Sequence, residues 1–282
     1  MERIKAALER AQQERQQSPI NPPSDPSQGD HTGSEQISYS QTRTMKVPAR
    51  MLAEHRIISG TSSEEFADAY KILRTQVLQR LSDNNWNALA VTSPGEQEGK
   101  TLTAINLAIS LAMEVNYTVL LVDADLRHPS IHEYFGLRPE RGLSDYLTGD
   151  VPLQEILIHP EGIGHCVILP GGKPLQNSSE LLNSPKMVQL VDELKTRYPS
   201  RIVVFDLPPL LTASDALAFS PYVDAALLVI EEGKTKVHDL ERASELLKGT
   251  NLLGTVLNKS NSISSGGNKK PGWLSRLLSP QH

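Results

Sequence analysis

The sequence predicts an α/β fold, a doubly wound and mostly parallel sheet with helices on both faces. Short apolar runs without polar alternation recur along the chain, as expected of strands that are covered on both faces. The segments between these runs are long enough to cross over as helices, and no internal repeat is present. A chain of 282 residues with 38% hydrophobic content is sufficient for one such domain with tails.

Each element of this fold has its own signal. The candidate strands are residues 88–92, 119–122, 167–169, 202–205, 225–230 and 252–257. Residues 101–114 are typical of the intervening helices, because their apolar side chains fall on one stripe. The single cysteine, Cys166, precedes the third run, and we expect it to be a small buried strand residue.

The two ends of the chain lack this alternation. Residues 2–17 are expected to form a short polar helix, followed by a disordered linker rich in Pro, Ser, Gly and Asp. We therefore predict an N-terminal helix and linker over residues 1–45, a folded domain over 46–260 and a flexible tail over 261–282.

Composition excludes some classes of function. The formal net charge of -5 provides no global basic field, which argues against nucleic acid as a partner. No apolar run approaches the roughly 20 residues that span a bilayer, and the start MERIKAALER lacks the apolar stretch of a signal peptide, so a cytoplasmic protein is expected. The loop histidines lack metal-ligand spacing, and we assign them no metal role. These are His128, His132, His159 and His165.

The stretch VTSPGEQEGKT, which we call the phosphate loop (residues 91–101), connects an apolar strand to a helix. Gly95 and Gly99 allow the backbone to approach phosphate oxygens closely. Loop amides and the positive end of the helix would surround the phosphates, and Lys100 would add a full positive charge. Thr101 would ligate Mg²⁺ through its hydroxyl. This pattern indicates a nucleotide site.

Three residues of the phosphate loop are unusual for such a site. Pro94 stands where the general pattern has glycine, and Glu96 and Glu98 lie beside the expected phosphates. Because carboxylates repel a triphosphate, we expect both glutamate side chains to point into solvent or toward a basic neighbour.

Acidic residues follow two of the predicted strands. Asp123 and Asp125 come at the end of the second run, and Asp206 ends the fourth. The carboxyl ends of parallel strands form the edge of the sheet where ligands bind. Carboxylates there can hold hydrated Mg²⁺ and can orient or deprotonate an attacking hydroxyl.

In these motifs the chain resembles a known family over residues 52–259. It is similar to the bacterial tyrosine kinases of polysaccharide export, of the CpsD/CapB type, and in particular to the exopolysaccharide-associated tyrosine autokinases found near exosortase systems. Their fold is similar to that of the MinD and ParA P-loop ATPases. The family's Walker A, Walker A′ and Walker B motifs match GEQEGKT, LLVDADLRHP and VVFDLPP.

The resemblance implies roles for individual residues. The catalytic residues would be Lys100, Asp123, Asp125 and Asp206, with Asp123 as base or metal organiser. Mg²⁺ would be held by Thr101, Asp123 and Asp206. ATP would be bound by Gly95, Glu98, Gly99, Lys100, Thr101, Leu102, Arg127 and Asn258. Within that set, Asn258 would contact adenine and Arg127 would be available to phosphate or to a neighbouring subunit.

The implied function is ATP-dependent protein-tyrosine (auto)kinase activity in exopolysaccharide or capsule biosynthesis and export. The family's oligomerisation pattern ExxRxxR reads here as Asp68, Lys71 and Arg74, which implies a homo-oligomer, with a ring as one form. The activator would be a separate membrane chain-length or export protein with a cytoplasmic tail. Such a partner would allow a peripheral position at the inner face of the plasma membrane.

The phosphate acceptor departs from the family pattern. Family members often end in a tyrosine cluster, but here no tyrosine follows Tyr222. Of the seven tyrosines, Tyr39 alone falls in a segment predicted to be disordered, which makes it a candidate acceptor.

Two alternatives stay open. A MinD/ParA-like ATPase would hydrolyse ATP without phosphorylating a protein, although those ATPases usually carry a signature lysine where this chain has Gly95. A nucleotide-gated scaffold would bind ATP and regulate polysaccharide chain length with negligible turnover.

Overall fold

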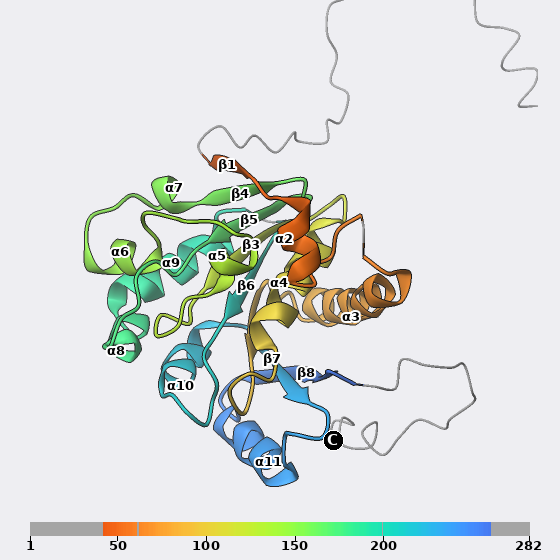
Figure 1. Ribbon diagram of the computed structural model, residues 1–282. Coiled ribbons are helices and arrows are strands. Elements are labelled where there is room, and N and C mark those ends of the chain that lie inside the picture. Colours follow the sequence, from red (N-terminus) through yellow and green to blue (C-terminus); the bar gives the residue numbers. More distant parts are fainter. Residues whose placement is uncertain (1–41, 61, 199, 261–282) are drawn as a thin grey trace, which may run out of the picture. The chain divides into compact units, whose positions relative to one another are not determined.

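An eight-stranded sheet forms the centre of the domain, in the order β1-β4-β5-β3-β6-β2-β7-β8 (Figure 1). The computed structural model describes residues 42–60, 62–198 and 200–260. The strands are β1 (Arg43–Lys46), β2 (Ala88–Thr92), β3 (Thr118–Asp123), β4 (Ile158–Glu161), β5 (Cys166–Leu169), β6 (Arg201–Asp206), β7 (Ala225–Glu231) and β8 (Asn251–Asn258). Neighbouring strands of this sheet are parallel except β4 and β5. The predicted fold class is therefore confirmed.

All six predicted strands are present, as β2, β3, β5, β6, β7 and β8. The sequence did not indicate β1 and β4, because RTMK and IHPE are short, polar and without an apolar run. The predicted domain boundary at residue 46 falls inside β1, which begins at Arg43. The predicted helix over 2–17, Tyr39 and the tail over 261–282 lie outside the described residues.

Helices cover both faces of the sheet (Figure 1). They are α2 (Ala49–Glu54), α3 (Glu64–Asp83), α4 (Lys100–Ala112), α5 (Ile131–Tyr134), α6 (Leu143–Thr148), α7 (Leu153–Ile156), α8 (Ser178–Leu182), α9 (Pro185–Thr196), α10 (Asp215–Phe219), a 3-10 turn (Ser220–Tyr222) and α11 (Val237–Leu246). Alternate residues of β2 face opposite layers: Leu89 and Val91 pack with α3 and α4, whereas Ala88 and Ala90 pack with α9.

Helix α4 is enclosed by the fold, which fixes the residues at its start. All of its residues are buried except Lys100 and Leu102. Its buried Asn106 accepts from the Ile58 amide at 2.8 Å and donates to the Arg56 carbonyl at 3.0 Å. A helix that is buried all round presents its N-terminus in a fixed place.

Two smaller expectations can be compared with the structure. Cys166 is a buried strand residue, as predicted, and burial raises the pKa of its thiol to about 12. A thiol of that pKa is unreactive at neutral pH. Among the described residues, no helix combines the length and the apolar character that crossing a bilayer requires.

Candidate active site

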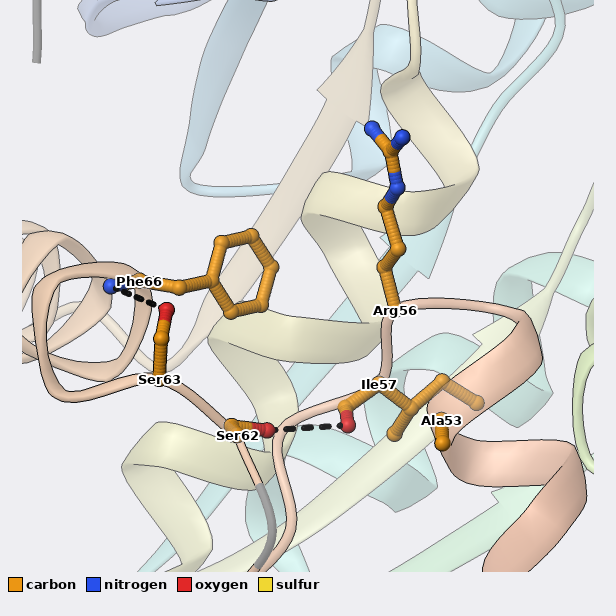
Figure 2. Close-up of a pocket in the computed structure, with 6 residues that line it drawn as sticks. All are labelled: Ala53, Arg56, Ile57, Ser62, Ser63 and Phe66. Atoms are coloured by element: carbon orange, nitrogen blue, oxygen red, sulfur yellow. Dashed lines mark hydrogen bonds between the residues drawn. The ribbon is translucent and has the colours of Figure 1, made fainter.

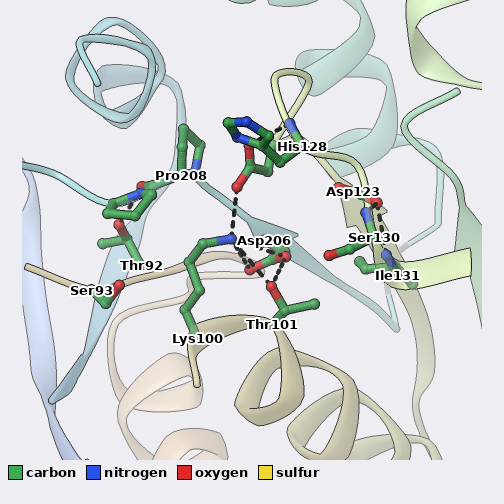
Figure 3. A network of polar contacts seen from close by, with 12 residues as sticks. Thr92, Ser93, Lys100, Thr101, Asp123, His128, Ser130, Ile131, Asp206 and Pro208 are labelled. Carbon is green, nitrogen blue, oxygen red and sulfur yellow. Dashed lines mark hydrogen bonds and ion pairs between the residues drawn. The ribbon is translucent and has the colours of Figure 1, made fainter. Parts of the chain in front are cut away.

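The carboxyl ends of β3, β6 and β2 lie side by side and bring the predicted catalytic residues to one edge of the sheet (Figure 3). Asp123 of β3 is in register with Asp206 of β6, which is in register with Val91 of β2. The chain leaves β2 through the phosphate loop and enters α4 at Lys100. The sheet register therefore brings together residues more than 80 positions apart.

Lys100 is the cation of this cluster. Its Nζ lies 2.9 Å from Asp125 Oδ2, 3.4 Å from both Asp206 oxygens and 3.2 Å from the Thr101 hydroxyl oxygen. Burial alone would lower the pKa of the Lys100 amine, but attraction to Asp206 and Asp125 outweighs burial and raises this pKa. Lys100 therefore remains an ammonium ion at neutral pH.

Asp123 has one oxygen engaged and one without a partner. Its Oδ2 accepts from the amides of Ser130 and Ile131 at 2.9 and 3.0 Å (Figure 3). Its Oδ1 is buried without a hydrogen-bond partner in the described part of the chain. Burial, with added repulsion from Asp206, raises the pKa of Asp123 to about 8. A buried polar atom without a partner is unfavourable, so this oxygen is suited to bind a ligand or a proton.

The residues at this edge fit Mg²⁺. Thr101 donates its hydroxyl to Asp206 Oδ2 at 2.7 Å, which places two hard oxygen ligands together. Asp123 Oδ1 adds an oxygen without a partner among the described residues. In that part of the chain, no group of three His, Cys, Asp or Glu could hold a metal by itself. Mg²⁺ is usually held by one or two carboxylates together with substrate phosphates and water, and Asp206, Asp123 and the Thr101 hydroxyl fit the protein's share of such a site.

Side chains that follow β7 or lie at the end of β8 donate hydrogen bonds to the backbone of the phosphate loop. Lys234, Lys259 and Asn258 donate to the carbonyls of Glu96, Gln97 and Glu98, at 2.8, 2.8 and 2.9 Å respectively. Gly99 has a left-handed φ of 92°, and a Cβ there would lie 2.0 Å from Asn258 Nδ2. The left-handed φ therefore favours glycine at position 99, and a Cβ there would also displace the Asn258 side chain from the loop. Asn258 holds the loop in this structure, and its contact with adenine stays a prediction.

The expectation for Glu98 was wrong, and that for Glu96 is confirmed. Glu96 is exposed. Glu98 is only 3% exposed, and no ion pair among the described residues joins it to a basic side chain. Its carboxylate accepts from the Gly95 amide at 3.0 Å and from the Thr235 hydroxyl. The loop turns residue 98 inward, where an amide and a hydroxyl satisfy the charge in place of a cation.

Several other predicted residues make contacts within the chain. Arg127 Nε lies 3.0 Å from Oδ2 of the fully buried Asp215, so this part of the guanidinium is occupied by a carboxylate. Leu102 lies half-buried on α4. Whether either residue contacts nucleotide stays a prediction.

The predicted oligomerisation residues divide between surface and interior. Asp68 and Lys71 are exposed on α3 and pair with each other at 2.8 Å. Arg74 turns toward the end of α4, where it donates to the Ser110 carbonyl at 3.1 Å and pairs with Glu114 at 2.9 Å. Two of the three residues are thus available to a neighbouring subunit.

Four residues around the site were missed in the sequence. Lys259 directly follows Asn258 in VLNKS, and its position next to a predicted site residue could have indicated that it also lies near the site. Thr235, Lys234 and Asp215 lie in segments without a motif, and only the fold brings them to the loop or to Arg127.

A separate hollow of about 390 Å³ lies between α2 and the start of α3 (Figure 2). It is lined by Ala53, Arg56, Ile57, Ser62, Ser63 and Phe66. Ser62 donates to the Ile57 carbonyl, and Ser63 caps α3 by accepting from the Phe66 amide, each at 3.4 Å. Arg56 is the one ionisable residue of this lining, which provides no pair of groups for acid–base chemistry.

The raised pKa of Asp123 predicts how stability depends on pH in the nucleotide-free protein. The folded carboxyl holds its proton up to about pH 8, whereas its ordinary pKa is 3.8. Between these values the folded state binds a proton that the unfolded state has released, so the free energy of unfolding should fall as pH rises. Asp123→Asn should make this fall shallower, because the substitution removes the carboxyl that binds the extra proton. Part of the fall should remain, because Asp206 also has a raised pKa. Urea denaturation at pH 6, 7 and 8 measures both slopes, and equal slopes would contradict the assignment.

Comparisons with known proteins agree with this geometry. Residues 89–272 match the family model described as the CobQ/CobB/MinD/ParA nucleotide binding domain. Tyrosine-protein kinase YwqD of Bacillus subtilis is 33% identical over 194 residues, which are 68% of this chain and 80% of YwqD. Tyrosine-protein kinase ptk of Acinetobacter johnsonii is 30% identical over 213 residues, 74% of this chain but 28% of ptk. The chain thus spans most of YwqD and under a third of ptk.

A solved structure matches over most of its length as well. The kinase domain of the Escherichia coli tyrosine kinase ETK has a TM-score of 0.67 and 28% identity. The match covers 83% of this chain and 90% of that domain.

Proposed function

Because the chain belongs to the CobQ/CobB/MinD/ParA nucleotide binding domain family, and within it to the bacterial tyrosine-protein kinases, we propose that it transfers the γ-phosphoryl group of ATP to protein tyrosine. One observation carries the proposal: the Lys100 ammonium lies between Asp125 and Asp206 at the carboxyl edge of three adjacent strands. This edge provides a cation for the phosphates beside carboxylates for Mg²⁺ and for proton transfer.

Each residue of the site would have a separate role in phosphoryl transfer. When bound, Mg²⁺ would neutralise phosphate charge, held by Thr101 and Asp206. Lys100 and the loop amides would bind the phosphates and stabilise charge on the transferred group. Asp123 would accept the proton of the tyrosine hydroxyl at its free Oδ1. With a pKa of about 8 Asp123 is a stronger proton acceptor than an ordinary carboxylate, and near neutral pH its ionised fraction would act as the base.

The proposal includes a place in exopolysaccharide or capsule biosynthesis and export. The activator would be a separate membrane chain-length or export protein whose cytoplasmic tail brings this chain to the inner face of the membrane. We also propose a weak or ATP-dependent homo-oligomer, which is supported by the exposure of Asp68 and Lys71 on α3. Light scattering with and without nucleotide tests the oligomer, and a strict monomer in both states would refute it.

Incubation of the full chain with labelled Mg-ATP is expected to yield phosphotyrosine, measured together with released phosphate. The reaction should be repeated with the cytoplasmic tail of the cognate membrane protein, because a kinase that needs its activator would be silent alone. Phosphate without phosphotyrosine in both reactions would favour the ATPase alternative, and neither product would favour the scaffold. Mapping of phosphopeptides would then test Tyr39 as the acceptor.

A further inference from the structure

The buried Glu98 side chain accepts a hydrogen bond from Thr235, a residue that belongs to none of the nucleotide-binding motifs. Glu98 directly precedes Gly99 and Lys100, so a carboxylate free to move there would compete with a bound phosphate for the same cation. We propose that Thr235 is a positioning residue that holds the Glu98 carboxylate away from the phosphate site. The inference rests on the proposed function in so far as the ligand is a nucleotide.

The hydrogen bonds around Thr235 fix the direction of its proton. Its hydroxyl oxygen accepts from the Glu231 amide at 2.9 Å. The hydroxyl proton is then directed to Glu98 Oε1, while Glu98 Oε2 accepts from the Gly95 amide at 3.0 Å. Each carboxylate oxygen of Glu98 thus receives one donor, and the side chain is 3% exposed. Removal of one donor would leave a buried charge half satisfied.

The loop backbone does not depend on this pair alone. Lys234, Lys259 and Asn258 bind the carbonyls of residues 96–98 independently of Thr235. When the hydroxyl is lost, the loop should therefore keep its path while the Glu98 side chain changes its position.

The structure leaves room for that change. Glu98 and Thr235 line a cavity of about 320 Å³ beside the phosphate loop, and the other lining residues include Lys234, Asp239 and Arg242. A released carboxylate has room to turn within this space, and its charge would no longer be satisfied by the Thr235 hydroxyl while it stays next to Gly99 and Lys100. Charge repulsion, rather than loss of the loop, would then weaken nucleotide binding.

A double-mutant cycle tests the inference by calorimetric titration of the full chain with Mg-ADP. Thr235→Val should weaken binding about tenfold or more, because the released Glu98 carboxylate repels the phosphates. Glu98→Gln removes the charge: its carbonyl oxygen can still accept from the Gly95 amide, while its NH₂ group can only donate to the Thr235 hydroxyl oxygen, so its affinity is the reference for a loop without the carboxylate. The double variant should return to the affinity of Glu98→Gln, and Thr235→Ser should bind like the wild type. Thr196→Val, an exposed helix position whose hydroxyl donates to the Asp192 carbonyl, is the matched control.

Additive losses in the double variant would overturn the inference, and so would unchanged binding in Thr235→Val. A purely structural role for Thr235 predicts additivity, because the Glu231 amide loses its acceptor in both variants that carry valine. If the wild type binds no nucleotide, the proposed function fails, and amide hydrogen exchange at Gly95 decides the inference by itself. Faster exchange at Gly95 in Thr235→Val supports the pair, and equal exchange refutes it.

Discussion

Replacement of Lys100 by alanine is expected to lower phosphoryl transfer about a thousandfold, the effect of removing a preorganised charge from a site where negative charge develops. Nucleotide affinity should fall as well, because the ammonium is the cation that the structure places among Asp125, Asp206 and Thr101. Phosphotyrosine formation and Mg-ADP titration measure the two effects.

Lys248→Ala is the matched control for this variant. Lys248 is exposed and pairs at the surface with Glu245, so its removal should leave both readings unchanged. Since Lys100→Ala leaves Asp125 and Asp206 without their cation, circular dichroism must first show that the variant is folded. A folded Lys100→Ala protein with wild-type transfer would contradict the assignment of the phosphate site.

Asp123→Asn should lower the rate of tyrosine phosphorylation by about 10²–10⁴, the range for loss of a general base. The asparagine carbonyl can still accept from the Ser130 and Ile131 amides, so the local fold should persist. The affinity for Mg-ADP should change little if Asp123 acts as the base. Single-turnover kinetics at saturating nucleotide measures the chemical step.

The exposed Asp192 on α9 provides the control, since Asp192→Asn changes the same group far from the strand ends. A lower affinity for Mg-ADP in Asp123→Asn, with a normal rate once nucleotide is saturating, would assign Asp123 to the metal in place of the hydroxyl. An unchanged rate and affinity would refute both roles.

The strands and the site edge could be predicted because their signals are local. Runs such as residues 88–92 are apolar on both faces, and Asp123 and Asp206 follow such runs directly. Because parallel strands align their carboxyl ends at one edge of the sheet, Lys100 and Asp206 could be expected to lie close together. Strand β4 has no comparable signal, because its sequence IHPE is short and contains a proline and two polar residues.

Side-chain direction within the phosphate loop could not be predicted. Glu98 turns inward because Thr235, 137 positions later, provides a hydroxyl at the right place. In the same way, Arg127 is occupied by Asp215, a residue 88 positions away in a segment without a motif. Both contacts depend on tertiary placement, which local sequence patterns do not encode.

If the carboxylates around Lys100 stand where a Mg-nucleotide binds, a crystal structure with Mg²⁺ and a non-hydrolysable ATP analogue will show it. The predicted result has the phosphates within the loop, the Lys100 amine moved from Asp125 to a phosphate oxygen, and the ion beside Thr101 and Asp206. A nucleotide bound elsewhere, with Lys100 still 2.9 Å from Asp125, would contradict this placement of the nucleotide site.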